Sequence, residues 1–151
     1  MQVRKVVLLL VLILISVTVV KGQKTKKRDI VKLATSGLTI SEASKGDSVK
    51  YYAVYLANVV KFMDEDRYNY SRIRLDTKED VLAWFDEAIN ASNSLKENPD
   101  QIIYGEKAFY KMKSKSIHLF ISTNNNSEEY FKCTTLLLEK AKNRFIKKTS
   151  K

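Results

Sequence analysis

The feature that most constrains the fold is an amphipathic pattern in residues 76–93, DTKEDVLAWFDEAINASN. Its apolar residues recur at the three- and four-residue spacing of one helix face, and no glycine or proline interrupts them. Asp76 is a suitable N-cap, and Glu79 follows at capping-box spacing. Pro99 stands in the polar connector that follows. The pattern predicts a helix whose apolar side the rest of the chain covers.

Alternating apolar residues before this helix predict strands. Residues 30–40 are expected to form one strand or two short ones, with Gly37 as a bulge or bend. Lys45-Gly46-Asp47 is a turn signal. Residues 49–63 are rich in aromatic and β-branched residues, which favours a long strand, although a helical stripe also fits them. Residues 64–69 are read as an acidic turn, and residues 70–75 as a strand that leads into the helix.

The second half of the chain repeats this sequence of patterns. Residues 101–113 are expected to form a strand with a bulge or turn at Gly105, and residues 117–123 a second strand. Ser127 is the expected N-cap of a second helix, which would run from Tyr130 to Phe145 and beyond; a strand over residues 130–135 is the alternative. The predicted fold is α+β: a two-layer sandwich of a mostly antiparallel sheet with two helices on one face, arranged as a β-ββα-ββα pseudo-repeat.

The N-terminus has the three parts of a secretory signal. Arg4 and Lys5 precede an apolar run over residues 6–20, and Lys21-Gly22 precedes the expected cleavage site before Gln23. The run is shorter than the ~20 residues that span a bilayer comfortably. Lys24, Lys26, Lys27 and Arg28 oppose translocation, so an uncleaved membrane anchor is the alternative. The predicted organisation is a signal peptide over residues 1–22, a flexible basic lead-in over 23–29 and a single domain over 30–151, secreted or periplasmic.

Composition limits the partners and the chemistry. The 151 residues carry a formal net charge of +10, which falls to +7 if the signal takes Arg4, Lys5 and Lys21 with it. A basic balance favours anionic partners. The chain has one cysteine, Cys133, and one histidine, His118, which excludes an internal disulfide and the usual Cys/His zinc clusters. We therefore predict no metal, no cofactor and no catalytic residue; Cys133 and His118 lack a third group to orient them.

The predicted ligand-binding residues are Lys111, Lys113 and Lys115, with Tyr51 and Tyr55. The three lysines alternate, so in a strand they face one side, opposite Tyr110 and Met112. Tyrosines from the strand over residues 49–63 could interleave with this row. Basic rows with aromatic side chains can hold anionic chains, although edge lysines also protect sheets from aggregation.

The sequence thus favours a non-enzymatic exported binding module for a protein or for an anionic glycan or lipid surface, with nucleic acid disfavoured by export. A small hydrolase that uses Asp64, Asp66, Asp86 or Asp100 is one alternative; it would need two carboxylates in one cleft. A membrane-tethered structural subunit is another. Asn69, Asn90 and Asn125 stand in glycosylation sequons whose use depends on the host.

Overall fold

The structure is a computed structural model that describes residues 24–33, 37–61, 66–113, 116–123 and 131–150, with the side chains of 58–61 and 66–70 left aside. Within these residues the chain forms two four-stranded antiparallel sheets and two helices, an α+β fold as predicted. The predicted signal peptide, Lys115, Asp64 and Asn125 lie outside the described residues.

The first sheet is a meander of strands in the order β1-β2-β3-β4. Its strands are β1 (Lys26–Leu33), β2 (Leu38–Lys45), β3 (Ser48–Lys61) and β4 (Asp66–Leu75). The stretch over residues 49–63 is therefore a strand as far as Lys61, which settles the open choice between strand and helix. Gly37 opens β2 at φ +67°, and a Cβ there would lie 2.5 Å from the Ala57 Cβ. Glycine is required because of both this backbone conformation and this close approach.

The second sheet is a smaller meander in the order β5-β6-β7-β8. It contains β5 (Ile102–Tyr104), β6 (Phe109–Met112), β7 (Leu119–Ser122) and β8 (Phe131–Cys133). Gly105 lies in the turn between β5 and β6, where its N–H donates to the Ala108 carbonyl oxygen at 2.8 Å. The strands therefore form two sheets where the sequence suggested one layer, and the ββα repeat is not confirmed. Each helix instead follows a four-stranded meander.

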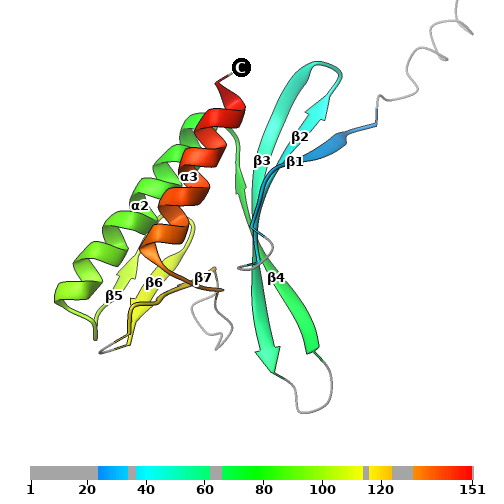
Figure 1. Cartoon of the computed structure of the whole chain (residues 1–151). Helices are drawn as coiled ribbons and strands as arrows, with labels where there is room; N and C mark the ends of the chain where they lie inside the picture. The colour runs from blue at the N-terminus through cyan, green and yellow to red at the C-terminus, as the bar shows by residue number, and fades with distance from the viewer. Residues whose placement is uncertain (1–23, 34–36, 62–65, 114–115, 124–130, 151) are drawn as a thin grey trace, which may run out of the picture.

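The two helices, α2 (Lys78–Glu97) and α3 (Thr135–Thr149), lie side by side and antiparallel, with the β1–β4 sheet beside them (Figure 1). Polar contacts join both ends of the pair. Lys78 Nζ donates to the Thr149 carbonyl at 3.1 Å, and the Ser92 and Thr135 hydroxyls are hydrogen-bonded at 2.7 Å. The lysine also places positive charge at the C-terminus of α3, where the helix dipole favours it.

One hydrophobic core joins all of these elements. Its largest fully buried side chains come from both sheets and both helices: Leu38, Ile40 and Leu56 from the first sheet, Tyr110, Leu119, Ile121 and Phe131 from the second, and Phe85, Leu95, Leu138 and Phe145 from the helices. The Tyr52 ring meets the Phe145 ring edge-on, with centroids 5.6 Å apart. The helices therefore pack against the inner faces of both sheets, which also meet each other through β3 and β8, and each sheet keeps an outer face.

Two predicted helix starts are wrong. Helix α2 is capped by Thr77 and not by Asp76: Thr77 Oγ1 accepts from the Asp80 N–H at 3.1 Å, and the Thr77 N–H donates to Asp80 Oδ2 at 2.9 Å. Hydrogen bonding of the Thr77 side chain and backbone to the Asp80 carboxylate lowers the pKa of this group. The capping box is thus shifted by one residue, because Asp76 continues from β4 and forms an ion pair with Arg74 at 3.2 Å.

The second helix starts later than Ser127 predicted. Its N-cap is Thr134, whose hydroxyl accepts from the Leu137 N–H at 3.3 Å. Phe131 and Cys133 are buried while Lys132 is exposed, so this segment alternates as a strand and pairs with β7. Pairing with the open edge of β7 and burial of Phe131 and Cys133 in the core outweigh the helical spacing of the sequence. The alternative of a strand near residues 130–135 is therefore confirmed for Phe131–Cys133.

Two boundaries also differ from prediction. Strand β1 begins at Lys26, which pairs with Ser44, so part of the expected flexible lead-in belongs to the first sheet. Strand β4 begins at Asp66, which pairs with Lys61, so residues 66–69 extend the β3–β4 hairpin where an acidic turn was expected. In both places, backbone pairing with a neighbouring strand extends the strand into polar sequence.

Candidate binding surfaces

The outer face of the β1–β4 sheet carries a row of aromatic and cationic side chains. Tyr51 and Tyr55 alternate along β3 with the buried residues Tyr52 and Val54, so they point away from the helices. Arg72 and Arg74 alternate in the same way along β4 with buried Ile73 and Leu75, and both arginines are exposed.

Strand register brings these four residues together. Tyr55 pairs with Arg72 across the β3–β4 ladder, and Ala53 pairs with Arg74. The Arg74 guanidinium carbon lies 4.6 Å from the centre of the Tyr51 ring, and that of Arg72 lies 5.3 Å from Tyr51 and 6.0 Å from Tyr55. These are cation–π distances. We call Tyr51, Tyr55, Arg72 and Arg74 the tyrosine–arginine ladder.

Small residues lie between the rings of this ladder. Ala53 stands between Tyr51 and Tyr55 on β3 and is only 2% exposed, and its neighbour on β2, Ser41, is 5% exposed. Ser41 donates to Asp29 Oδ1 at 2.6 Å, which satisfies the hydroxyl. The tyrosine rings therefore project beyond the small side chains of Ala53 and Ser41, and the two arginines lie along one side of the rings.

The predicted lysine row belongs to the other sheet. Tyr110 and Met112 are buried in the core, as the alternation predicted, and Lys111 faces the outer side of β6. Lys113 follows the end of β6 and lies over the Phe120 ring, 5.9 Å from its centre. Lys115 lies outside the described residues. Lys111 pairs with Ile102 and with Phe120, and Phe120 pairs with Lys132.

The predicted tyrosines and lysines are therefore not brought together. The aromatic side chains next to Lys111 and Lys113 are Phe109 and Phe120 of the same sheet. The partners of Tyr51 and Tyr55 are Arg72 and Arg74, which the sequence reading did not single out. Their alternation in Arg72-Ile73-Arg74-Leu75 was a usable signal, because two arginines beside two buried apolar residues mark the open face of a strand.

A cleft of about 230 Å³ lies where the N-terminal half of α2 meets the turn after β5; its lining includes Trp84, Glu87 and Glu106. Glu87 Oε1 accepts from the Tyr110 hydroxyl at 2.7 Å, and Glu87 Oε2 accepts from the Glu106 N–H at 3.1 Å. Burial raises the pKa of Tyr110, and the adjacent Glu87 carboxylate raises it further.

This network has a structural explanation. A Cβ on Gly105 would lie 1.9 Å from Glu87 Oε1, so glycine lets the carboxylate approach the β5–β6 turn. The buried Trp84 Nε1–H makes no hydrogen bond of acceptable geometry within the described part of the chain. It nevertheless lies near enough to Tyr110 to lower the pKa of that hydroxyl slightly. Glu87 of α2 therefore links this helix to the second sheet through its hydrogen bonds with Tyr110 and Glu106.

Asp76 and Asp80 also line the cleft at α2, whereas the candidate catalytic side chains that the structure describes, Cys133, His118, Asp86 and Asp100, do not. Cys133 is 3% exposed, and burial raises the pKa of its thiol to about 12, so it is protonated at neutral pH. Asp86 forms an ion pair with Lys142 of α3. Asp100 lies beyond Glu97, the last residue of α2, which is itself about 16 Å along the helix axis from Asp86. Among the described residues, no three His, Cys, Asp or Glu side chains are grouped to hold a metal ion.

No helix in the described part of the chain is both apolar and long enough to cross a bilayer. The chain matches no protein-family model, no curated protein and no solved structure. The α+β fold and the outer faces of its two sheets are therefore the features that bear on function.

Proposed function

We propose that the chain is an exported, non-enzymatic binding module that recognises an acidic polysaccharide through the tyrosine–arginine ladder. The observation that carries the proposal is the position of the Arg72 and Arg74 guanidinium groups over the Tyr51 and Tyr55 rings on an outer sheet face. The signal-like N-terminus and the net charge of +10 support it.

The chemistry of the ladder fits an anionic, extended ligand. A guanidinium group held against a ring keeps its planar fork of N–H donors, which matches the geometry of carboxylate and sulfate groups. Less side-chain entropy is lost on binding because the stacking already limits the rotamers. Arg74 forms an ion pair with the exposed Asp76 at 3.2 Å. Arg72 has no carboxylate partner among the described residues.

The shape of the ladder favours a linear polymer. Tyr51 and Tyr55 stand four positions apart on β3, so their Cα atoms are about 13 Å apart, and the Arg72 guanidinium lies within reach of both rings. An elongated ligand can therefore lie along β3, with its apolar surface on the rings and its charged groups toward β4. Tyrosine suits this role because it combines a large apolar ring with a polar hydroxyl.

Binding to dextran sulfate, with neutral dextran as the uncharged comparison, tests the proposal. We expect R72Q/R74Q to weaken dextran sulfate binding at least tenfold in calorimetry, because two charge-assisted contacts are lost. R72K/R74K keeps the charge but loses the planar fork, so we expect it to weaken binding as well. K140Q/K147Q on α3 removes the same charge and should leave this binding unchanged.

The outcome that contradicts the proposal is equal weakening by R72Q/R74Q and K140Q/K147Q, which would mean that net charge alone attracts the polymer. Full binding by R72K/R74K would contradict the role of the stacked guanidinium groups.

A further inference from the structure

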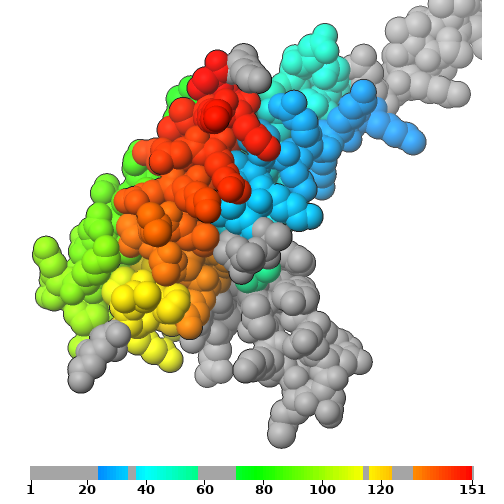
Figure 2. All heavy atoms as spheres, viewed as in Figure 1, coloured from blue at the N-terminus to red at the C-terminus, as the bar shows by residue number. Residues whose placement is uncertain are grey.

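The outer side of α3 is a basic surface of the described chain. Leu138, Ala141 and Phe145 are buried and define the inner side of this helix. At 100° per residue, the opposite side is centred on Leu136, Asn143 and Lys147, with Lys140 beside them and Arg144 toward the flank. Figure 2 shows α3, in orange and red, exposed along its length. We call Leu136, Lys140, Arg144 and Lys147 the α3 face.

Few carboxylates balance this charge. Among the described residues, Lys140, Arg144 and Lys147 form no ion pair, whereas Lys142, on the flank of the helix, pairs with Asp86 of α2. Glu139 is the single acidic residue within α3. The net positive charge of the helix is therefore presented outward and not cancelled by its neighbours.

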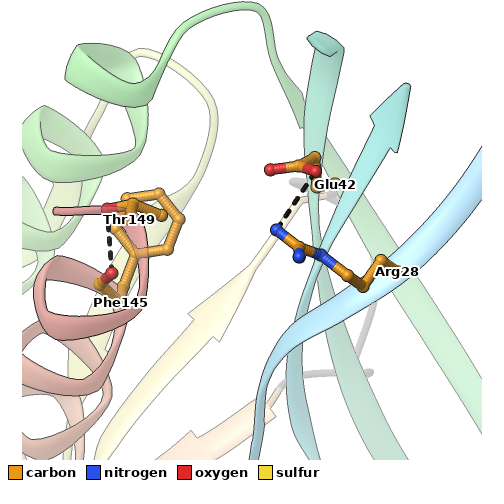
Figure 3. A network of polar contacts seen from close by, with 4 residues as sticks. All are labelled: Arg28, Glu42, Phe145 and Thr149. Atoms are coloured by element: carbon orange, nitrogen blue, oxygen red, sulfur yellow. Dashed lines mark hydrogen bonds and ion pairs between the residues drawn. The ribbon is translucent and has the colours of Figure 1, made fainter. Parts of the chain in front are cut away.

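Packing of α3 beside β1 extends the basic surface. The two elements are in contact, and Figure 2 shows β1, in blue, on the same side of the molecule as the C-terminal end of α3. Lys24, Lys26 and Lys27 are exposed at the start of β1. Arg28 pairs with Glu42 at 3.4 Å close to Phe145 and Thr149 of α3 (Figure 3). Residues more than a hundred positions apart in the sequence thus form one basic surface.

The α3 face also exposes an apolar side chain. Leu136 is 73% exposed, and it lies one turn before Lys140 on the same side of the helix. A shallow groove on α3 is lined by Leu136, Glu139, Lys140, Asn143, Arg144 and Lys147, and it contains no aromatic side chain. An exposed leucine beside lysine and arginine side chains can enter a membrane interface while the cations contact anionic headgroups.

The neighbouring sequence favours the same partner. The chain enters β1 directly from the apolar run over residues 6–20 and the basic residues that follow it. A signal or an anchor, the two roles that the pattern of this run predicts, would each bring the start of β1 to a membrane.

We infer that the α3 face, together with the start of β1, docks the domain on an anionic lipid bilayer. In the docked state Lys140, Arg144 and Lys147 contact lipid phosphate or carboxylate groups, and Leu136 enters the boundary between headgroups and acyl chains. The long lysine stems can lie along this boundary while their ammonium groups stay hydrated. This surface is separate from the tyrosine–arginine ladder, so both can be occupied at once.

Vesicle co-sedimentation of the protein as recovered from its host tests this inference. The two vesicle types are phosphatidylcholine alone and phosphatidylcholine with about 30% phosphatidylserine, an anionic surface. Each cation near such a surface contributes roughly fivefold to partitioning, so we expect K140Q/K147Q to reduce binding to the anionic vesicles roughly 25-fold. Binding to the neutral vesicles should not change, which separates this surface from any effect of the N-terminal run.

Two further variants make the test specific. L136S should also reduce binding to the anionic vesicles, although it changes no charge, and its exposed position leaves the core intact. R72Q/R74Q is the matched control, because it removes two cations from the opposite side of the first sheet and should leave vesicle binding unchanged. Circular dichroism of each variant confirms that the fold is retained.

Three results would overturn the inference: vesicle binding that K140Q/K147Q leaves intact, equal losses from K140Q/K147Q and R72Q/R74Q, or a parallel loss of dextran sulfate binding in K140Q/K147Q. The last result would make the α3 face a general anion surface. Failure of the polysaccharide proposal shows itself separately, in the response of dextran sulfate binding to R72Q/R74Q.

Discussion

At the scale of single residues, the environment decides the chemistry that a side chain can perform. Cys133 lies near the start of α3, where sequence alone allows a reactive thiolate. The structure places it in β8 with 3% exposure, and burial raises the pKa of the thiol to about 12. The same holds for Tyr110, whose hydroxyl is held by Glu87 in the core. Both groups stabilise the fold in their neutral forms.

The pKa of Cys133 predicts how stability depends on pH. Between pH 9.0, the ordinary value, and about 12, the unfolded chain is ionised at this thiol while the folded chain is not. Unfolding therefore releases a proton, and the contribution of the thiol, complete below pH 9, is lost as pH rises to 12. We expect the wild type to lose stability more steeply than C133A in this window, by about 1.4 kcal/mol per pH unit.

Urea unfolding of both proteins at several pH values measures this difference. Lysine ionisation affects the two proteins alike and cancels in the comparison. A constant difference in unfolding free energy from pH 8 to pH 11 would show that the folded thiol ionises as easily as the unfolded one.

At the scale of elements, helix α2 shows how capping fixes a helix start. The sequence contains two overlapping solutions, Asp76 with Glu79 and Thr77 with Asp80. The structure adopts the second, in which both reciprocal hydrogen bonds are formed. Asp76 is then available to Arg74 at the end of β4. The strand that precedes the helix therefore decides between two locally equivalent caps.

Replacing each candidate cap by alanine tests this assignment. We expect T77A to destabilise the protein by about 1 kcal/mol, because the Asp80 N–H loses its acceptor. D76A should have a much smaller effect, since it removes only an exposed ion pair. Thermal unfolding followed by circular dichroism measures the stability of both variants. A larger destabilisation by D76A than by T77A would show that Asp76 is the N-cap of α2.

At the scale of the whole molecule, both sheets depend on the same pair of helices. Phe145 is fully buried and packs against Tyr52 of the first sheet, while Phe85 of α2 lies in the same core as Tyr110 and Leu119 of the second. The helices are also joined to each other at both ends. The two sheets should therefore unfold together.

The variant F145A tests this coupling. We expect it to cost about 3–5 kcal/mol, the usual range for a buried phenylalanine. Fluorescence of the single tryptophan, Trp84 in α2, and far-ultraviolet circular dichroism should report the same shifted midpoint. I146A changes the neighbouring exposed residue and should have little effect. Separate midpoints for the two signals in F145A would show that the sheets unfold independently.

The sequence by itself determined the local elements. Period-two and period-3.6 patterns depend only on which residues neighbour each other along the chain, so they identified α2, the strand over residues 49–61, the turn at Gly46 and the inward side of Tyr110 and Met112. The basic charge and the expected anionic partner also follow from composition alone. The predictions of these local elements are confirmed because each depends on short-range physics, and the anionic partner stays a prediction.

Only the tertiary structure decided which segments lie together. Phe131–Cys133 became a strand because β7 offered an unpaired edge, and the eight strands paired as two separate sheets around one core. For the same reason Tyr51 and Tyr55 met Arg72 and Arg74 and not the lysines of β6, and the start of β1 came to lie beside α3. Such contacts depend on register and packing between distant segments, which no spacing along the chain encodes.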